Sequence, residues 1–324
     1  MTIRSFAVAA LATTFLFAQE PAAPAAPATP PAPALPEAGS PAATALLDKA
    51  IGKMKAYGRG AFTTTEANDS AMLRGVGLPF GNEDTEVAGG WHHHLVWADN
   101  DGKEFMRANG RMLAKVDGAW KLRGKKLAGG RPAPFTLDPD LLFTVLGDLP
   151  AAARKVVHVE AGEVAGKKVA ILSLALEEDV AREFADSGAV PAGGGGAGGL
   201  LMIGGPGGMD PPENDYVCYV ALCIDPDSGD LLRLSSKVYE QNEMMGNVQI
   251  QVAGGAGGDE EEDDKDDEEE AAAAGQPLKW KKGLPVKKPA KDESVTTFRV
   301  DFKKLGLAEP PALDDRAKAL LRMQ

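Results

Sequence analysis

Three turn dipeptides at eight-residue intervals constrain the fold of this chain most: Asp101-Gly102, Asn109-Gly110 and Asp117-Gly118. Asn-Gly and Asp-Gly favour two-residue β-hairpin turns. Strands joined by such short connections have to pair antiparallel. The sequence therefore predicts an antiparallel meander over residues 87–123, with strands near residues 103–107, 111–116 and 120–123.

The first strand of this meander is expected at residues 91–97, where the side chains alternate. Successive side chains of a strand point to opposite faces of the sheet. A continuous strand would direct His92, His94 and Val96 to one face. It would direct four side chains to the other: Trp91, His93, Leu95 and Trp97.

The remaining chain mixes helical and strand patterns. Helices are expected at residues 43–57, 138–149, 178–187 and 314–323, the second with Asp138 as N-cap and Pro139 at its first position. Strands are expected at residues 61–66, 156–159, 164–176, 216–224, 231–239, 248–252 and 295–302. The order predicts an α+β domain with a mostly antiparallel sheet.

The N-terminal segment predicts export. Residues 1–18 carry one charge, Arg4, followed by an apolar run over residues 6–17. This run has the length of a signal-peptide core and is too short to span a bilayer. Residues 19–42 are rich in proline and alanine and suit an extended tether. We expect a periplasmic or secreted protein whose folded domain covers residues 43–324.

Charge is distributed unevenly along the chain. The net charge is −12, and residues 259–270 hold eleven acidic residues and one lysine. Such a block is typically solvated and disordered. We expect a disordered acidic and basic insert at residues 254–292 and a flexible glycine-rich loop at residues 188–212. No basic face is predicted for the folded part, which disfavours nucleic acid as a partner.

Cys218 and Cys223 are the two cysteines of the chain. A disulfide requires Cα atoms within about 7 Å. Five residues along a strand span about 16 Å, and an odd offset places the two side chains on opposite faces. The spacing predicts two separate buried thiols.

The sequence contains no recognisable catalytic motif. His92 and His94 would suit a metal, but a full site needs further ligands, and the only other histidine outside the cluster is His158. Residues 225–230 are rich in aspartate but lack the spacing of an EF-hand loop, so a hairpin turn is favoured. A loop at residues 162–168 departs from the phosphate-binding pattern. We expect no enzyme activity, no cofactor and no metal.

The meander instead carries several large apolar side chains. Their structural interpretation is a domain core, and their functional interpretation is a concave sheet that holds an acyl chain. The candidate ligand-lining residues are Trp91, Leu95, Trp97, Met112, Trp120 and Leu122.

Four segments together resemble the LolA-like superfamily of periplasmic lipoprotein carriers. They are residues 46–66, the end of the meander at 117–122, the helix at 137–149 and the hairpin at 224–231. The resemblance implies a curved, open antiparallel sheet (a half-barrel) with helices packed on one side. It also implies a lipid or lipoprotein acyl chain as the ligand. The alternatives are an envelope structural protein with a filled core, which would bind envelope proteins, and a hydrolase of unrecognised type.

Overall fold

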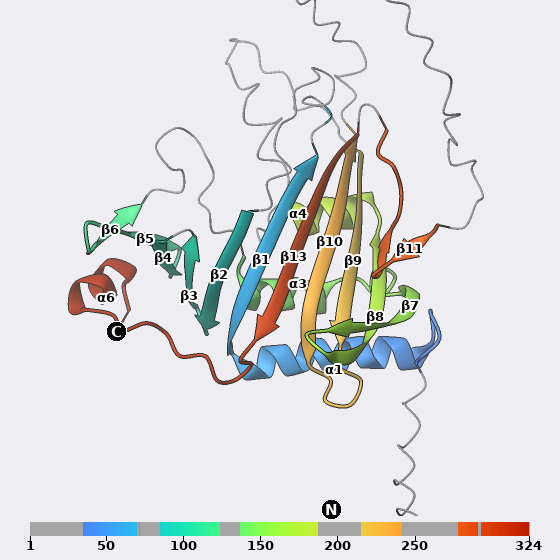
Figure 1. The fold of residues 1–324 in the computed structure, drawn as a ribbon, viewed down its shortest axis with the longest axis horizontal. Coiled ribbons are helices and arrows are strands. Elements are labelled where there is room, and N and C mark those ends of the chain that lie inside the picture. Colours follow the sequence, from blue (N-terminus) through green and yellow to red (C-terminus); the bar gives the residue numbers. More distant parts are fainter. Residues whose placement is uncertain are drawn as a thin grey trace, which may run out of the picture. The chain divides into compact units, whose positions relative to one another are not determined.

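An open antiparallel sheet of eleven strands forms the framework of the computed structural model (Figure 1). The structure describes residues 35–69, 71, 85–100, 102–123, 137–186, 215–241, 278–290 and 293–323. The strand order is β6-β5-β4-β3-β2-β1-β13-β10-β9-β8-β7. The strands are β1 Arg59–Asp69, β2 Thr85–His92, β3 Leu95–Asn100, β4 Lys103–Ala108, β5 Arg111–Val116, β6 Ala119–Arg123, β7 Val156–Val164, β8 Lys167–Leu176, β9 Asp215–Ile224, β10 Leu231–Gln241 and β13 Glu293–Lys303. The α+β class and the open antiparallel sheet are confirmed.

The meander forms as its turn dipeptides predict. Asn109 and Gly110 have φ of 50° and 70°, and Asp117 and Gly118 have φ of 54° and 76°. Two consecutive residues with positive φ are typical of the hairpin turn that matches strand twist. Strands β4, β5 and β6 pair in sequence around these turns.

Strand β13 joins the two halves of the sheet. It pairs with β1 on one side, where Phe62 lies opposite Phe302, and with β10 on the other, where Leu234 lies opposite Val300. Strands β1 and β10 do not pair with each other. Strand β13 therefore connects the half of the sheet formed by β1–β6 with the half formed by β7–β10.

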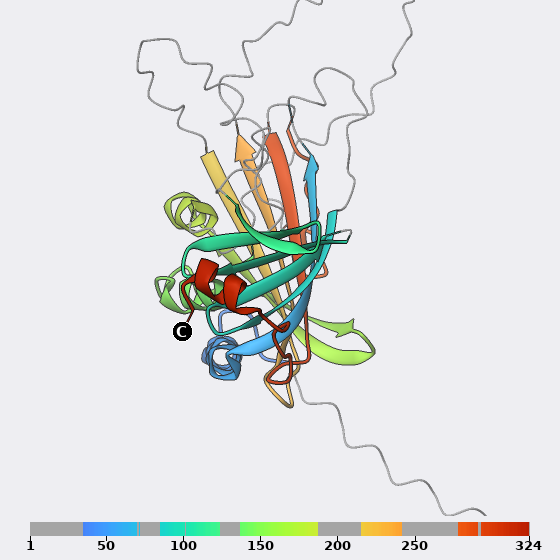
Figure 2. The same cartoon turned by 90° about the vertical axis from the view of Figure 1, so that its left-hand side faces the viewer.

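Three helices lie on one side of the sheet: α1 (Pro41–Tyr57), α3 (Pro139–Asp148) and α4 (Glu178–Asp186) (Figure 2). Helix α1 begins at Ser40, whose hydroxyl accepts a hydrogen bond from the Ala43 amide at 3.2 Å. Helix α3 begins as expected, with Asp138 accepting from the Leu141 amide at 3.2 Å. These side chains satisfy amide groups that a helix start leaves unpaired. No described helix is long and apolar enough to cross a bilayer.

We call the sheet surface that packs toward these helices the helix face. It belongs to a single large core cluster. Figure 2 shows β3–β6 crossing at a large angle to β9 and β10 and turning toward the side of the helices. The buried side chains of the helix face include Phe62, Val87, Trp91, Val96, Phe105, Met112, Leu172, Leu174, Val220, Leu222, Leu234, Phe298, Val300 and Phe302.

The opposite surface, the outer face, is covered at two places. Helix α6 (Asp315–Leu321) packs Ala317 and Leu321 on the meander. A small hairpin of β11 (Trp280–Lys281) and β12 (Leu284–Pro285) covers the strands of the other half. This hairpin lies within residues 254–292, where we predicted an insert without regular structure. Residues 254–277 and 291–292 of this insert lie outside the described residues. The loop at residues 188–212 and the expected strand at residues 248–252 also lie outside them.

Candidate functional site

Trp91 of β2 is the largest fully buried side chain of the helix face. Its ring centroid lies 6.4 Å from that of Phe62 and 5.9 Å from that of Phe302. Phe143 of α3 continues the cluster at 5.5 Å from Phe302. Gly60 makes room for the indole, because a Cβ at residue 60 would lie 2.2 Å from a Trp91 ring atom. Trp91 is therefore held by the sheet beneath it and, through Phe302 and Phe143, linked to a helix.

The Trp91 indole nitrogen has no hydrogen-bond partner among the described residues, although it is buried. Buried polar groups usually have a partner, and leaving one unpaired costs about 1–3 kcal/mol. The Trp91 indole nitrogen is therefore a fully buried donor on the helix face without an acceptor among the described residues.

Residues 91–97 do not form the continuous strand that their alternation suggested. Strand β2 ends at His92, and β3 starts at Leu95. The two residues between them, His93 and His94, form a turn. His93 has φ of 50°, and its amide donates to the Gly58 carbonyl at 2.6 Å. The turn reverses the chain without a glycine, so the sequence offered no turn dipeptide to mark it.

This reversal separates the six candidate ligand-lining residues. Trp91 pairs with Val96 across the hairpin, and His92 pairs with Leu95, so Trp91 and Leu95 lie on opposite faces. Trp91 and Met112 belong to the cluster of the helix face. The other four lie on the outer face. Leu95, Trp97 and Trp120 belong to the cluster that packs against α6. Leu122 lies opposite Leu113 of that cluster.

The outer-face members have different surroundings. Leu95 and Trp120 are buried against α6, whereas Leu122 is 52% exposed. Leu95 also lines a groove of about 690 Å³ beside the histidine turn and residues 310–313. Its lining is mainly apolar, but histidines and the cationic side chains of Lys318 and Arg322 add polar groups to it.

Two charged groups mark the rim of the helix face. Arg107 of β4 forms a 2.8 Å ion pair with Asp138 at the start of α3, which ties the meander to this helix. Glu66 of β1 lies opposite Phe298, and its burial raises its pKa above the ordinary value.

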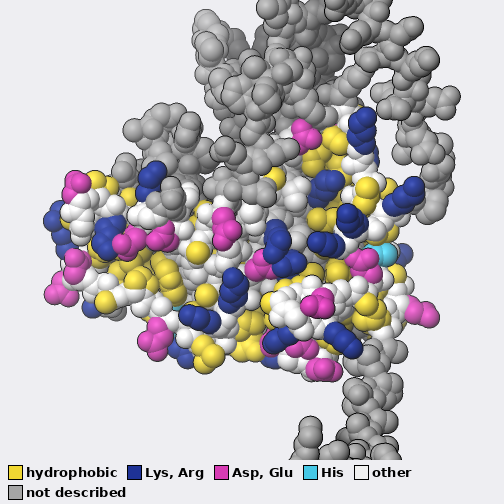
Figure 3. Space-filling view, viewed as in Figure 1, with side chains coloured by type: hydrophobic (Ala, Val, Ile, Leu, Met, Phe, Trp, Pro, Cys, Tyr) yellow, Lys and Arg dark blue, Asp and Glu magenta, His cyan; other side chains and the backbone are white. Residues whose placement is uncertain are grey.

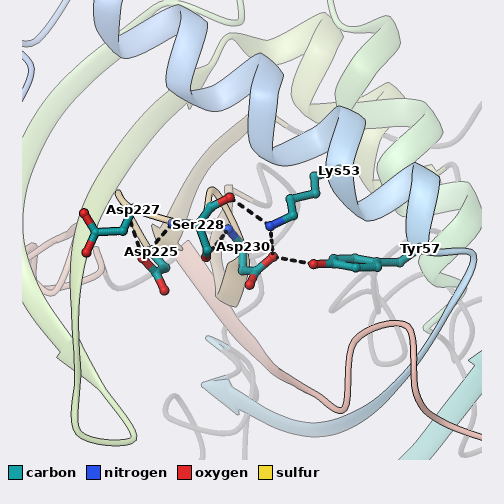
Figure 4. Close-up of polar contacts among 6 residues, drawn as sticks. All are labelled: Lys53, Tyr57, Asp225, Asp227, Ser228 and Asp230. Carbon is teal, nitrogen blue, oxygen red and sulfur yellow. Dashed lines mark hydrogen bonds and ion pairs between the residues drawn. The ribbon is translucent and has the colours of Figure 1, made fainter.

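A polar network fastens α1 to the turn between β9 and β10 (Figure 4). Lys53 forms a 2.8 Å ion pair with Asp230, and Tyr57 donates to the same carboxylate at 2.8 Å. Lys53 also donates to the Ser228 carbonyl at 2.8 Å. Burial acts to raise the pKa of Asp230, but hydrogen bonds from Lys53, Tyr57 and Ser228 outweigh it and leave this pKa lowered. The network fixes one end of α1 relative to the sheet.

The aspartates of residues 225–230 act as turn residues. Asp225 accepts from the amides of Asp227 and Ser228 at 3.0 and 3.2 Å, which is the arrangement of an Asx turn. The described residues contain no group of three or more His, Cys, Asp or Glu side chains with metal-ligand geometry. His92 and His94, which we placed on one strand face, lie instead at a strand end and in the turn.

The two cysteines lie on opposite faces of β9, as their spacing predicts. Both are free and buried, Cys218 in the core of the helix face and Cys223 in the outer-face cluster under β12. Burial raises the pKa of Cys218 to about 12 and that of Cys223 to about 11.

We expect both thiols to resist an aromatic disulfide reagent in the native protein. The thiolate is the reactive form, and at neutral pH the raised pKa values keep it scarce while burial blocks access. Unfolding in denaturant should release two rapidly reacting thiols per chain. Rapid native labelling of either cysteine, followed by absorbance and mass spectrometry, would contradict the buried placement.

The sequence reasoning missed the aromatic partners of Trp91. Phe62 and Phe302 share a cross-strand pair of β1 and β13, which are far apart in the sequence. Both lie in strands that the sequence predicts, at residues 61–66 and 295–302, but only the pairing of β1 with β13 brings them together.

The sequence matches no protein-family model and no curated protein. Among solved structures, LprF from Mycobacterium bovis aligns with a TM-score of 0.38 at 14% identity, over 87% of this chain and 100% of LprF. The lipoprotein LppX from Mycobacterium tuberculosis aligns with a TM-score of 0.33 at 10% identity, over 85% and 100%. A LolA superfamily protein from Nitrosomonas europaea aligns with a TM-score of 0.25 at 7% identity, over 83% of this chain and 94% of that protein. The chain has distant structural similarity to these lipoprotein and LolA-superfamily folds.

Proposed function

We propose that this chain is an exported, non-catalytic binding protein that holds a lipid or lipoprotein acyl chain on the helix face of its sheet. The observation that carries the proposal is the extent of that apolar face. Helix α1 packs on β10 and α4 packs on β9, and the buried apolar side chains of the same face continue through β2, β3 and β4 to Met112 of β5. The signal-like residues 1–18 support export to the periplasm or the exterior.

The proposed contacts are those of Trp91 and Met112 with the acyl chain. An apolar guest needs no charge, and each methylene group removed from water contributes about 0.8 kcal/mol. The unpaired Trp91 indole nitrogen offers a donor to the ester or carboxyl oxygen of the guest. The four candidates on the outer face do not contact the acyl chain in the proposed site.

The second candidate function is that of an envelope structural protein with a filled core. Trp91 is 0% exposed and packs against Phe62 and Phe302 of its own chain, which favours this alternative. The two functions differ in whether the helix face admits a guest.

Quenching of tryptophan fluorescence by brominated fatty acids separates the two functions. If an acyl chain enters the helix face, the bromine atoms approach Trp91, and quenching should fall sharply in Trp91→Phe. Affinity should rise about four-fold for each added methylene of the fatty acid. Mass spectrometry of organic extracts from the purified protein should also detect bound lipid.

Trp120→Phe provides the matched control, because Trp120 lies on the outer face against α6. It should leave the quenching that arises at Trp91 unchanged. Equal quenching in wild type and Trp91→Phe, together with lipid-free extracts, would eliminate the carrier function and leave the filled core.

A further inference from the structure

The hairpin of β11 and β12 presents a strongly basic surface on the outer face. Residues 278–290 contain no acidic residue, and their five lysines are all exposed. Lys287 pairs with Glu293 at 2.8 Å. For Lys281, Lys282 and Lys288 no ion pair is found among the described residues. Within the described part of the chain, these three lysines therefore have no carboxylate partner.

The hairpin is held firmly against the sheet by its turn. The Gly283 amide donates to the Glu160 carboxylate at 2.6 Å, and the Gly283 carbonyl accepts from the Ser173 hydroxyl at 2.8 Å. A Cβ at residue 283 would lie 2.5 Å from Ile171, so only glycine allows this close approach. Trp280 stacks on His158 with ring centroids 4.8 Å apart. The lysines thus extend from a fixed platform.

Exposed apolar side chains accompany the lysines. Val286 is 58% exposed, Leu278 is 43% exposed, and Val217 on the neighbouring strand β9 is 42% exposed. Figure 3 shows Lys and Arg side chains gathered, with hydrophobic side chains among them, over the part of the outer face formed by β13, β10 and β11. The strand side chains there include Lys237 of β10 and Arg299 of β13.

We propose that this surface, comprising the lysines and exposed apolar side chains of residues 278–290, docks the protein on an anionic phospholipid membrane. Lysines bind the negative surface of such a membrane, and each contributes about 1 kcal/mol near it, equivalent to about five-fold in affinity. Apolar side chains beside basic ones enter the boundary between headgroups and acyl chains. A soluble polyanion would gain nothing from Val286 and Leu278, so their exposure favours a membrane.

The docking surface lies on the outer face of the sheet, whereas the proposed acyl-chain site lies on the helix face. Acyl-chain binding is assigned to Trp91 and Met112, which the hairpin does not contact. Vesicle binding and fatty-acid quenching can therefore fail independently, and each failure identifies the proposal that is wrong.

Sedimentation of the full mature chain with vesicles tests the docking surface. Binding should be strong to phosphatidylcholine vesicles containing phosphatidylglycerol, weak to phosphatidylcholine alone, and reduced by added salt. Lys281→Gln combined with Lys282→Gln should weaken binding about 25-fold. Val286→Ser should weaken it several-fold without altering the charge.

The matched control is Lys155→Gln combined with Lys318→Gln, two exposed lysines outside the hairpin. This variant should bind anionic vesicles within about two-fold of wild type. Circular dichroism and thermal unfolding establish that all variants fold alike. Equal binding to neutral and anionic vesicles, an unchanged hairpin variant, or an equal loss in the control would each overturn the proposal.

Discussion

Trp91→Ala is expected to lower the free energy of unfolding by about 3–5 kcal/mol, the range found for truncating buried aromatic side chains. The indole packs between Phe62 and Phe302 and occupies the space left by Gly60. Since the sheet beneath it is fixed by pairing on both sides, the cavity cannot collapse fully. Denaturant unfolding followed by circular dichroism measures the loss as a lower transition midpoint.

Leu122→Ala is the control for this prediction. Leu122 is 52% exposed on the outer face of edge strand β6, so its truncation should change stability by less than about 0.5 kcal/mol. Similar losses for Trp91→Ala and Leu122→Ala would mean that Trp91 is not part of a packed core.

Asp230→Ala should destabilise the protein by about 1–2 kcal/mol at neutral pH. The substitution removes the acceptor that holds both Lys53 and Tyr57 of α1. Hydrogen bonds to charged groups contribute about 1.5–3 kcal/mol, and partial exposure of this network reduces the value. Thermal or denaturant unfolding of the two proteins measures the difference.

The loss should depend on pH in a definite direction. The pKa of Asp230 is lowered in the folded protein, so its stabilising contribution is present above the unfolded value near 4 and is lost as pH falls through the folded value. Wild type and Asp230→Ala should therefore converge in stability at acidic pH. Asp227→Ala, which changes an exposed acid of the same turn, should show no such convergence.

Local signals in the sequence predicted the elements and several turns of this fold. Asn109-Gly110 and Asp117-Gly118 form the expected turns, and Asp138 caps α3 as its position before Pro139 indicates. The odd offset of Cys218 and Cys223 correctly placed their side chains on opposite faces of one strand. Each of these features depends on neighbouring residues alone.

Features that depend on pairing between distant segments of the chain could not be predicted from the sequence. The turn at His93 and His94 contains no glycine, and it is stabilised by a hydrogen bond to Gly58 from another part of the chain. Missing this turn placed Leu95 and Trp97 on the same face as Trp91. Similarly, the cluster of Trp91 with Phe62 and Phe302 exists only because β13 returns to pair with β1.

The position of β13 also governs when the sheet can be completed. Residues 293–303 lie near the end of the chain, yet they form the sole bridge between the β1–β6 and β7–β10 parts of the described sheet. Before this strand arrives, β1 and β10 each expose an unpaired edge, the kind of edge that promotes aggregation. Until β13 pairs with both strands, the β1–β6 and β7–β10 parts remain two separate incomplete sheets, so a variant that weakens β13 should aggregate more readily than one that weakens the edge strand β6.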